Sequence, residues 1–440
     1  MSADWNFETR QVHAGQTPDA ETASRALPIY QTTSYVFKDT EEAANRFALS
    51  ELGPIYTRIT NPTQATVEDR LASLEGGVGA LLVASGQSAE FLALINVAEA
   101  GDHVVSSPSL YGGTHNLFAH TLPKFGIEVT FVEDPADPDS WRAATKDNTK
   151  AFFGETVPNP KGDILDIEAV AGVAHDVGVP LIVDNTVGTP YLLRPLEWGA
   201  DVVVHSATKY IGGHGNSIGG VIVDGGTFDY GQHPDRFPGF NTPDESYHGL
   251  VYARDLGVDG PFGANLSYIL KARVQLLRDL GPAISPFNAF LLAQGIETLS
   301  LRVERHIDNT HKVAAYLDGH AQVKEIQWAS LPSSPYYELA QKYTPAGSGA
   351  VISFEIEGGL EAGRAFVNAL KLHSLVANIG DVRSLVIHPA STTHSQLTEE
   401  DQRAAGVTPG LVRLAVGIEH IDDILADLDL GFAAAADVTN

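Results

Sequence analysis

Three short apolar runs constrain the fold of this chain most strongly. They cover residues 80–84, 179–183 and 201–204, and small or polar residues follow each of them. Strands that are apolar along their whole length are buried on both faces, as is typical of parallel sheets covered by helices. The sequence therefore predicts an α/β fold with a mostly parallel sheet.

Polar side chains follow two of these runs where each predicted strand ends. Asp184 comes directly after the second run, and Ser206, Thr208 and Lys209 come shortly after the third. Ligands of parallel α/β sheets bind beyond the carboxyl ends of the strands. We therefore expect these four side chains to lie together at a ligand site.

The first run leads into residues 85–89, Ser-Gly-Gln-Ser-Ala, and then into an apolar helix pattern that starts at Glu90. Small residues at the start of a helix present free backbone N–H groups and the positive end of the helix dipole to an anion. Gly86 and Gln87 are therefore candidate ligands of a phosphate. An ordinary strand-to-helix turn is the competing interpretation, since Ser-Gly-x-Ser alone is not specific.

Lys209 and Asp184 together suggest pyridoxal phosphate chemistry. A lysine can form a Schiff base with this aldehyde, and a fixed anion keeps the cofactor's ring nitrogen protonated so that the ring withdraws electrons. Burial beside hydroxyl groups and a cationic ring disfavours the charged form of a lysine, which makes the amine nucleophilic. Either residue alone is weak support, because lysines and aspartates are common and Ser-x-Thr-Lys is a frequent surface string.

Short motifs along nearly the whole chain strengthen this interpretation. They occupy residues 12–15, 28–33, 56–58, 61–63, 85–87, 109–112, 155–156, 159–160, 183–186, 206–214, 388–394 and 411–419. With them the chain resembles the pyridoxal-phosphate enzymes of cysteine and methionine metabolism, which include cystathionine gamma-synthase, the cystathionine lyases, methionine gamma-lyase and O-acetylhomoserine sulfhydrylase. The resemblance implies an aspartate-aminotransferase-like fold (fold type I) with a smaller C-terminal α/β domain.

The resemblance also implies a role for each matched cofactor residue. Lys209 would bind the cofactor covalently, and Asp184 would pair with its ring nitrogen. The phosphate would be held by Gly86, Gln87, Ser206 and Thr208 of one subunit, and by Tyr56 and Arg58 of a neighbouring subunit. The active site would then be shared within a homo-oligomer, expected to be a tetramer built from dimers.

Four further residues would act on the substrate or the ring. Tyr111 would stack on the pyridine ring and serve beside Lys209 as a second catalytic acid or base. Asn159, Asn378 and Arg413 would bind the ring oxygen and the substrate carboxylate, for which a guanidinium fork is well suited. Without the resemblance, a structural ion pair with an acidic residue would be the better explanation of Arg413.

Three departures from the family's patterns indicate a branch. Gly113 stands where methionine-degrading relatives carry a cysteine, and Asn378 stands where many relatives have a serine. The sequence of residues 377–385 and 388–397 is similar to that of the O-acetylhomoserine sulfhydrylase branch. This branch also has a long segment like residues 225–263. That segment could instead be a plain surface excursion, since long loops are either functional or mobile.

The reaction that this branch implies is gamma-replacement on O-acetyl-L-homoserine. Sulfide, or a small thiol such as methanethiol, replaces acetate and gives L-homocysteine, or L-methionine, in methionine biosynthesis. A cystathionine gamma-synthase, a gamma-lyase and the use of O-succinylhomoserine stay open as alternatives. A protein that retains the cofactor for binding or regulation is the alternative outside enzymes.

Length and motif positions predict three parts of the 440-residue chain. Residues 1–60 would form an N-terminal arm that contacts a neighbouring subunit. Residues 61–265 would form the large domain that binds pyridoxal phosphate, and residues 266–440 would form the C-terminal small domain.

Composition excludes several other classes of protein. The chain has 55 acidic and 28 basic residues and a net charge of −27, so nucleic acid and anionic membranes are poor partners. It contains no cysteine, no membrane-length apolar run and no Gly-x-Gly-x-x-Gly after an early strand. We expect no metal site, because the histidine pairs His115/His120 and His306/His311 lack a third ligand, and we expect a cytoplasmic location.

Overall fold

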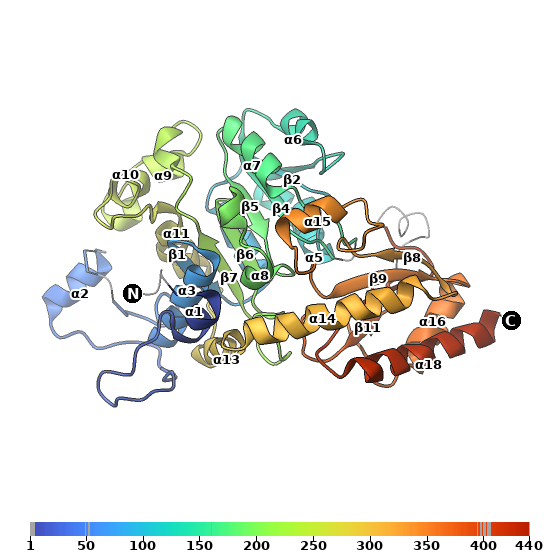
Figure 1. The fold of residues 1–440 in the computed structure, drawn as a ribbon. Coiled ribbons are helices and arrows are strands. Elements are labelled where there is room, and N and C mark those ends of the chain that lie inside the picture. The colour runs from blue at the N-terminus through green and yellow to red at the C-terminus, as the bar shows by residue number, and fades with distance from the viewer. Residues whose placement is uncertain are drawn as a thin grey trace.

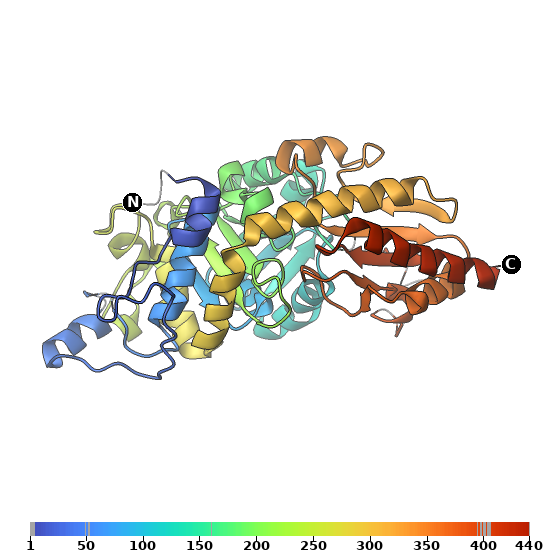
Figure 2. The same cartoon turned by 60° about the horizontal axis from the view of Figure 1, so that its bottom comes forward.

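The computed structural model describes residues 5–48, 50–51, 53–159, 161–393, 395–396, 398, 402 and 406–439. Pro160 and His394, which end two of the matched motifs, lie outside the described residues. Two sheets lie side by side in the structure, and the long helix α14 (Leu299–Asp318) runs alongside both regions (Figures 1 and 2).

The larger sheet has seven strands and is mostly parallel, as predicted. Its order is β1 (Gly79–Val83), β7 (Gly220–Asp224), β6 (Val202–Ser206), β5 (Leu181–Asp184), β4 (Thr149–Glu155), β2 (His103–Ser106) and β3 (Glu128–Phe131). Strand β7 alone among them is antiparallel to its neighbours β1 and β6. Strands β5 and β6 pair directly and in parallel, with Asp184 opposite Val204. The predicted adjacency of Asp184 and the Lys209 segment is therefore confirmed.

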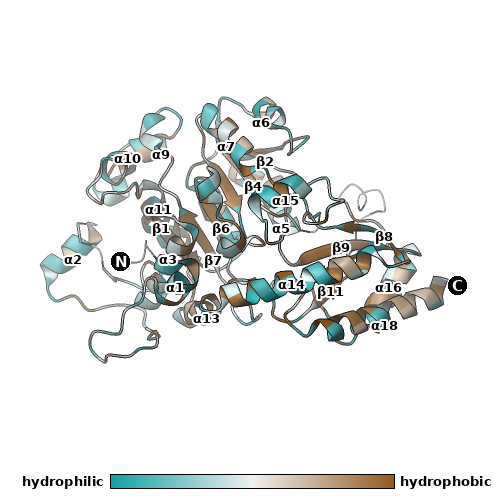
Figure 3. Cartoon of the chain, in the orientation of Figure 1, coloured by the Kyte–Doolittle hydropathy of each residue, from teal (hydrophilic) through white to brown (hydrophobic). Residues whose placement is uncertain are grey.

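Both faces of this sheet are buried, which explains the unbroken apolar runs. On β5, Leu181 and Val183 pack in one hydrophobic cluster with helices α3 and α13, while Ile182 packs in a second cluster with helices α4 and α11. All three side chains have no solvent exposure. The hydropathy view shows the strands of this sheet as a continuous apolar layer between more polar helices (Figure 3).

The helices around the larger sheet are mostly short. Their bounds are α1 (Phe7–His13), α2 (Thr40–Phe47), α3 (Pro62–Glu75), α4 (Gly86–Ile95), α5 (Gly112–Asn116), η1 (Leu117–Thr121), η2 (Leu122–Phe125), α6 (Pro138–Ala144), α7 (Ile167–Asp176), α8 (Thr189–Leu192), η3 (Pro195–Trp198), α11 (Ser267–Lys271), η6 (Ala272–Leu277), α12 (Arg278–Leu280) and α13 (Pro286–Ile296). The helices α11, η6 and α12 follow one another directly over residues 267–280.

The second sheet lies toward the C-terminus and is mostly antiparallel. Its order is β10 (Ser374–Leu375), β11 (Leu385–Ile387), β12 (Leu411–Ala415), β9 (Val351–Ile356) and β8 (Val323–Gln327). It forms its own hydrophobic core with α14, α16 (Gly359–Ala369) and α18 (Ile421–Thr439), in which Phe354, Phe366 and Phe432 pack together. The helices α15 (Tyr337–Tyr343) and η7 (Pro389–Ser391) complete this region.

Residues 225–263 form a compact aromatic segment that packs on the larger sheet's second hydrophobic cluster. The segment contains four single-turn helices, η4 (Tyr230–Gln232), α9 (Pro238–Asn241), η5 (Glu245–Tyr247) and α10 (Tyr252–Asp255). The rings of Tyr230 and Phe240 stack with centroids 4.1 Å apart, and both side chains are buried. The aromatic side chains of this segment are therefore part of the hydrophobic core beside the larger sheet.

The N-terminal segment has a packed part and an exposed part. Helix α1 packs against α3, whereas α2 has no buried residue and lies away from the body of the chain (Figure 1). The side chains of Val36 and Phe47 are 97% and 59% exposed. The predicted limits of arm, large domain and small domain stay predictions.

Two kinds of feature are absent from the described residues. Within that part of the chain, no helix is long and apolar enough to cross a membrane. No group of three or more histidine, aspartate or glutamate side chains is arranged there to bind a metal ion.

Candidate active site

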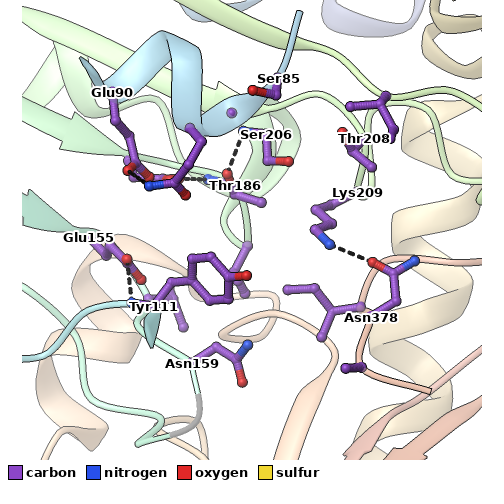
Figure 4. A pocket seen from close by; sticks show the side chains of 18 of the residues that line it. Ser85, Glu90, Tyr111, Glu155, Asn159, Thr186, Ser206, Thr208, Lys209 and Asn378 are labelled. Atoms are coloured by element: carbon purple, nitrogen blue, oxygen red, sulfur yellow. Dashed lines mark hydrogen bonds between the residues drawn. The ribbon is translucent and has the colours of Figure 1, made fainter. Parts of the chain in front are cut away.

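A cavity of about 300 Å³ opens where the carboxyl ends of β5 and β6 face the second sheet. Most of the predicted site residues line it, namely Gly86, Gln87, Tyr111, Asn159, Asp184, Ser206, Thr208, Lys209, Asn378 and Arg413. The volume is within the range of small-molecule sites. Residues more than 300 positions apart in the sequence therefore meet at one place, and Figure 4 shows the side chains of Tyr111, Lys209 and Asn378 directed into it.

Helix α4 starts at the edge of this cavity. Ser85 caps the helix by accepting a hydrogen bond from the backbone N–H of Ser88, and the N–H groups of Gly86 and Gln87 belong to the first turn, which the helix cannot satisfy itself. A Cβ atom on Gly86 would lie 2.7 Å from Cβ of Ser206, so the close approach of α4 to β6 requires glycine. The amides, Ser206 and Thr208 form a donor set that suits a phosphate.

Lys209 follows β6 and extends into the cavity. Its Nζ donates a hydrogen bond of 2.5 Å to Oδ1 of Asn378 (Figure 4). Burial lowers the pKa of Lys209, and the positive charge of Arg413 lowers it further. Both effects increase the fraction of neutral amine, which is the form that attacks an aldehyde.

The loop that carries Asn378 reaches the lysine because of Gly380. This residue has φ +71°, and a Cβ atom on it would lie 2.6 Å from the backbone nitrogen of Tyr210. A side chain there would push the loop away from Lys209. The glycine in residues 377–385 therefore has a structural reason.

Arg413 enters the cavity from β12 of the second sheet. Its Nη1 contacts Oδ1 of Asn159 at 3.3 Å, and its Nη2 donates to the backbone carbonyl of Asn378 at 3.1 Å. Burial lowers the pKa of Arg413 to about 10, and its Nε is buried without a hydrogen-bond partner among the described residues. No described carboxylate forms a salt bridge with it, so the structural ion pair is not found and the guanidinium can accept an external anion.

Asp184 ends β5 at the deep side of the cavity. Its Oδ1 accepts a hydrogen bond of 2.7 Å from the backbone N–H of Thr186. Burial raises the pKa of Asp184, and the hydrogen bonds from Thr186 oppose this change. The carboxylate remains partly exposed toward the cavity, which is the position of an anion that pairs with a cationic ligand group.

Tyr111 lies between the two sides of the cavity (Figure 4). Its backbone N–H donates to Oε1 of Glu155 at 2.6 Å, while 53% of the residue is exposed. A Cβ atom on Gly113 would lie 2.5 Å from Cε1 of the tyrosine ring. The glycine that replaces the relatives' cysteine therefore leaves room for the ring in this position.

Sequence reasoning missed two acidic residues of the site. Glu90 and Glu155 both line the cavity and are almost fully buried beside Asp184. Glu90 was visible only as a charged residue in an otherwise apolar helix pattern, and Glu155 only as part of a family motif. A charge inside an apolar pattern is a usable signal, because buried charges need a partner.

Tyr56 and Arg58 do not line the cavity of their own chain. The Arg58 guanidinium lies 5.4 Å from the centre of the Tyr56 ring and donates to the backbone carbonyl of Arg278. Tyr56 is 40% exposed. Their assignment to the phosphate of a neighbouring subunit stays a prediction.

These features define a class of protein. A buried lysine, an aspartate on the adjacent parallel strand and a phosphate-suited helix start fit pyridoxal phosphate, and the fold is that of the pyridoxal-phosphate enzymes of fold type I. The family of Cys/Met metabolism PLP-dependent enzymes matches residues 8–433, and the chain belongs to this family. The predicted fold class, family and cofactor are confirmed.

Comparison with known proteins agrees with this placement. The chain is 57% identical to O-acetyl-L-homoserine sulfhydrylase of Leptospira meyeri, over 98% of this chain and 97% of the relative. A putative O-acetylhomoserine (thiol)-lyase of Campylobacter jejuni, solved with N'-pyridoxyl-lysine-5'-monophosphate, is 42% identical to this chain, with a TM-score of 0.92. The match covers 98% of this chain and 100% of that chain. Cystathionine gamma-lyase of Lactobacillus plantarum is 32% identical, with a TM-score of 0.82 and coverage of 98% and 100%.

Proposed function

We propose that this enzyme catalyses gamma-replacement on O-acetyl-L-homoserine with sulfide, giving L-homocysteine and acetate. The name of the Leptospira relative and the high identity along both chains support this reaction. The observation that carries the proposal is Arg413, a buried guanidinium without a carboxylate partner among the described residues, beside Lys209. An amino-acid substrate supplies the missing carboxylate and places its α carbon near the lysine.

The residues of the cavity divide the work of binding. Arg413 and Asn159 hold the substrate carboxylate, and the guanidinium supplies two parallel donors. Asp184 holds the positive charge of the cofactor ring, while the start of α4, Ser206 and Thr208 hold its phosphate. When bound, pyridoxal phosphate withdraws electron density from the carbons next to the substrate amine.

Lys209 carries the protons of the reaction. Once released from the cofactor, its amine removes the α proton and passes it on, and a second proton then leaves the β carbon. Acetate departs from the γ carbon, sulfide bonds there, and the two protons return to the β and α carbons. The lowered pKa of Lys209 suits an amine that accepts and returns protons near neutral pH. Tyr111 is the second acid or base, since its ring lies in the same cavity.

We further propose that Tyr56 and Arg58 complete the phosphate site of a neighbouring subunit in a homo-oligomer, a tetramer built from dimers. Both lie on an N-terminal segment with exposed apolar side chains, and neither lines its own cavity. In this arrangement residues 1–60 are the arm, residues 61–265 are the cofactor domain and residues 266–440 are the small domain.

Assays that combine different acyl homoserine donors with different sulfur acceptors test the reaction. The purified holoenzyme is incubated with O-acetyl- or O-succinyl-L-homoserine, each with sulfide, methanethiol or cysteine, and also with cystathionine alone. We expect the highest kcat/KM for O-acetyl-L-homoserine with sulfide, with homocysteine and acetate formed in equal amounts.

Other outcomes assign other members of the family. Cystathionine formation from cysteine as the best reaction would assign a gamma-synthase, and keto-acid release from cystathionine would assign a lyase. Preference for O-succinyl-L-homoserine or for methanethiol would correct the donor or the acceptor. No turnover with any pair, from a protein that binds the cofactor, would leave a binding or regulatory protein.

A further inference from the structure

Three carboxyl groups meet at the deep side of the cavity, although the cofactor ring brings one positive charge. Glu90 comes from α4, Glu155 from β4 and Asp184 from β5. Glu90 is 3% exposed and Glu155 is 6% exposed. Three ionised carboxylates in so small and poorly solvated a space would repel one another strongly.

The contacts of Glu90 are those of a fixed side chain. Its Oε1 accepts a hydrogen bond of 2.9 Å from Oγ1 of Thr114, and its Oε2 has only a long contact of 3.4 Å with the side-chain amide of Gln87. The Asp184 carboxyl group lines the same side of the cavity, close enough to Glu90 for each group to affect the pKa of the other. Two carboxyl groups can share a hydrogen bond only if one of them carries a proton.

The surroundings decide which group carries it. Asp184 accepts a hydrogen bond from the backbone N–H of Thr186, which favours its anion. Among the described residues no cation acts on Glu90, and the Asp184 carboxylate lies near it. Burial first, and then Asp184, raise the pKa of Glu90 well above its usual range. Glu155, the third acidic group facing the pair, also has a raised pKa through burial and through the charge of Asp184.

We propose that Glu90 is a positioning residue that stays protonated and donates a hydrogen bond to the Asp184 carboxylate. The pair then presents a single negative charge to the cofactor's ring nitrogen. This inference rests on the role proposed for Asp184. Through Thr114, Glu90 also ties this charge to α5, the helix that Tyr111 precedes. The same side chain thereby sets the position of the anion and of the stacking ring.

The neutral isostere Glu90→Gln is the main test. A glutamine amide can donate to Asp184 while its carbonyl accepts from Thr114, so it reproduces both hydrogen bonds of a protonated glutamate. Glu90→Met keeps a similar length and removes both. Glu99→Gln is the matched control, since Glu99 lies just beyond the same helix and is exposed.

Three measurements on the holoenzymes distinguish the states of Glu90. They are the infrared carbonyl band of a protonated carboxyl in protein with labelled glutamate, the dissociation constant of pyridoxal phosphate, and the pH midpoint of the visible absorption. We expect Glu90→Gln to lose one protonated-carboxyl band while its dissociation constant and pH midpoint stay at the wild-type values. Glu90→Met should bind the cofactor about tenfold more weakly, because Asp184 loses a donor.

The opposite pattern overturns the inference. If Glu90→Gln keeps the wild-type infrared band and shifts the pH midpoint, Glu90 is ionised in the native protein. If Glu90→Met binds the cofactor as wild type does, Glu90 does not position Asp184. Should Glu90→Met not fold, the spectrum and titration of Glu90→Gln still decide. A failure of the proposed function differs from these results, because it would be a wild-type enzyme that makes no homocysteine.

Discussion

The two sides of the active-site cavity have opposite charge. On the deep side, Glu90, Glu155 and Asp184 bring acidic groups from three elements of the larger sheet region, whereas Lys209 and Arg413 bring cationic groups to the other side. The ring of Tyr111 lies between the two sides (Figure 4). Neither side neutralises the other, so the site suits a ligand that is cationic at one end and anionic at the other.

This comparison also explains how a chain with a net charge of −27 can bind anions. The field of the whole protein repels a phosphate or a carboxylate, so the positive potential must be local. It comes from the start of α4 and from Arg413, which has no carboxylate partner within the described part of the chain. Removing single charges should therefore have effects that differ from one side of the cavity to the other.

Removing the amine on the cationic side should have the largest effect. Lys209→Ala is expected to lower the rate of homocysteine formation by about 10³-fold or more, because the proton carrier and the covalent link to the cofactor are both lost. Steady-state assays give the rate, and borohydride reduction followed by peptide mapping locates the cofactor. Lys312→Ala is the control, since Lys312 forms only an exposed ion pair on α14. Cofactor trapped on another residue, with normal turnover, would reject the assignment.

On the acidic side, Asp184→Asn is expected to weaken binding of pyridoxal phosphate by about 100-fold, since a charged hydrogen bond to the ring nitrogen is replaced by a neutral contact. Turnover at saturating cofactor should fall as well. Equilibrium dialysis and visible absorption measure the two effects. If Asp184→Asn lowered only the free energy of unfolding and left both quantities unchanged, the carboxylate would be structural.

One buried carboxylate outside the site accepts hydrogen bonds on both of its oxygen atoms. Asp427 on α18 accepts hydrogen bonds from the backbone N–H groups of Lys371, Leu372 and His373 and from Nδ1 of His373. Burial alone would raise the pKa of Asp427, but these donors outweigh it and hold the pKa below the ordinary value of 3.8. Glu90 and Glu155 have fewer donors than Asp427, chiefly the Thr114 hydroxyl for Glu90 and the Tyr111 backbone N–H for Glu155, and their pKa values are raised.

Asp427→Asn should therefore lower the free energy of unfolding by about 2 kcal/mol at neutral pH, since amide N–H groups replace an acceptor of four hydrogen bonds. A depressed pKa stabilises the fold above the ordinary value and loses that contribution as the pH falls through the folded-state pKa. The difference between wild type and variant should thus shrink below about pH 3.8. Urea denaturation at several pH values measures it, with the exposed Asp423→Asn as control. An equal loss at all pH values would contradict this account.

The sequence predicted the acidic and cationic partners that lie on neighbouring strands. Asp184 and Lys209 follow apolar runs, and a run that is buried on both faces can hardly be anything but an inner strand. Because β5 and β6 are parallel neighbours, the two residues necessarily end at one edge. The positions of Asp184 and Lys209 could be predicted because each apolar run indicates the burial of its own strand.

The direction of β7 could not be predicted in this way. Its residues 220–224 are as apolar as those of the parallel strands. The link of residues 207–219 contains no helix that would carry a crossover, so the chain returns antiparallel between β6 and β1. Strand direction depends on the connection, whereas the apolar pattern reports only burial.

Contacts between segments that are distant in the sequence could not be predicted from it either. With 55 acidic residues in the chain, no local pattern could tell that Arg413 lacks a described carboxylate partner. Glu90 and Asp184 are 94 positions apart, and they meet at the cavity because α4 packs on β6, the strand next to β5. Such pairings depend on the assembled fold.

Arg413→Lys should separate binding from chemistry on the cationic side. Lysine keeps the charge but loses the two parallel donors, so KM for O-acetyl-L-homoserine is expected to rise about tenfold with a smaller change in kcat. Initial rates over a range of substrate concentrations give both constants. Arg383→Lys is the matched control, because the Arg383 side chain is exposed, pairs with Asp381 and does not line the cavity. An unchanged KM would remove Arg413 from the carboxylate site.

The two cations of this side should also influence each other. Burial is the main cause of the lowered pKa of Lys209, and the charge of Arg413 is the second. In Arg413→Gln the pKa of Lys209 should therefore rise, which leaves less neutral amine at a given pH. Apoprotein of this variant should combine with pyridoxal phosphate about threefold more slowly at neutral pH, and the difference should vanish at high pH, where the amine is neutral in both proteins. The rate of appearance of visible absorption across a pH series measures this, and a variant that reconstitutes faster at neutral pH would show that the two charges do not interact as the geometry requires.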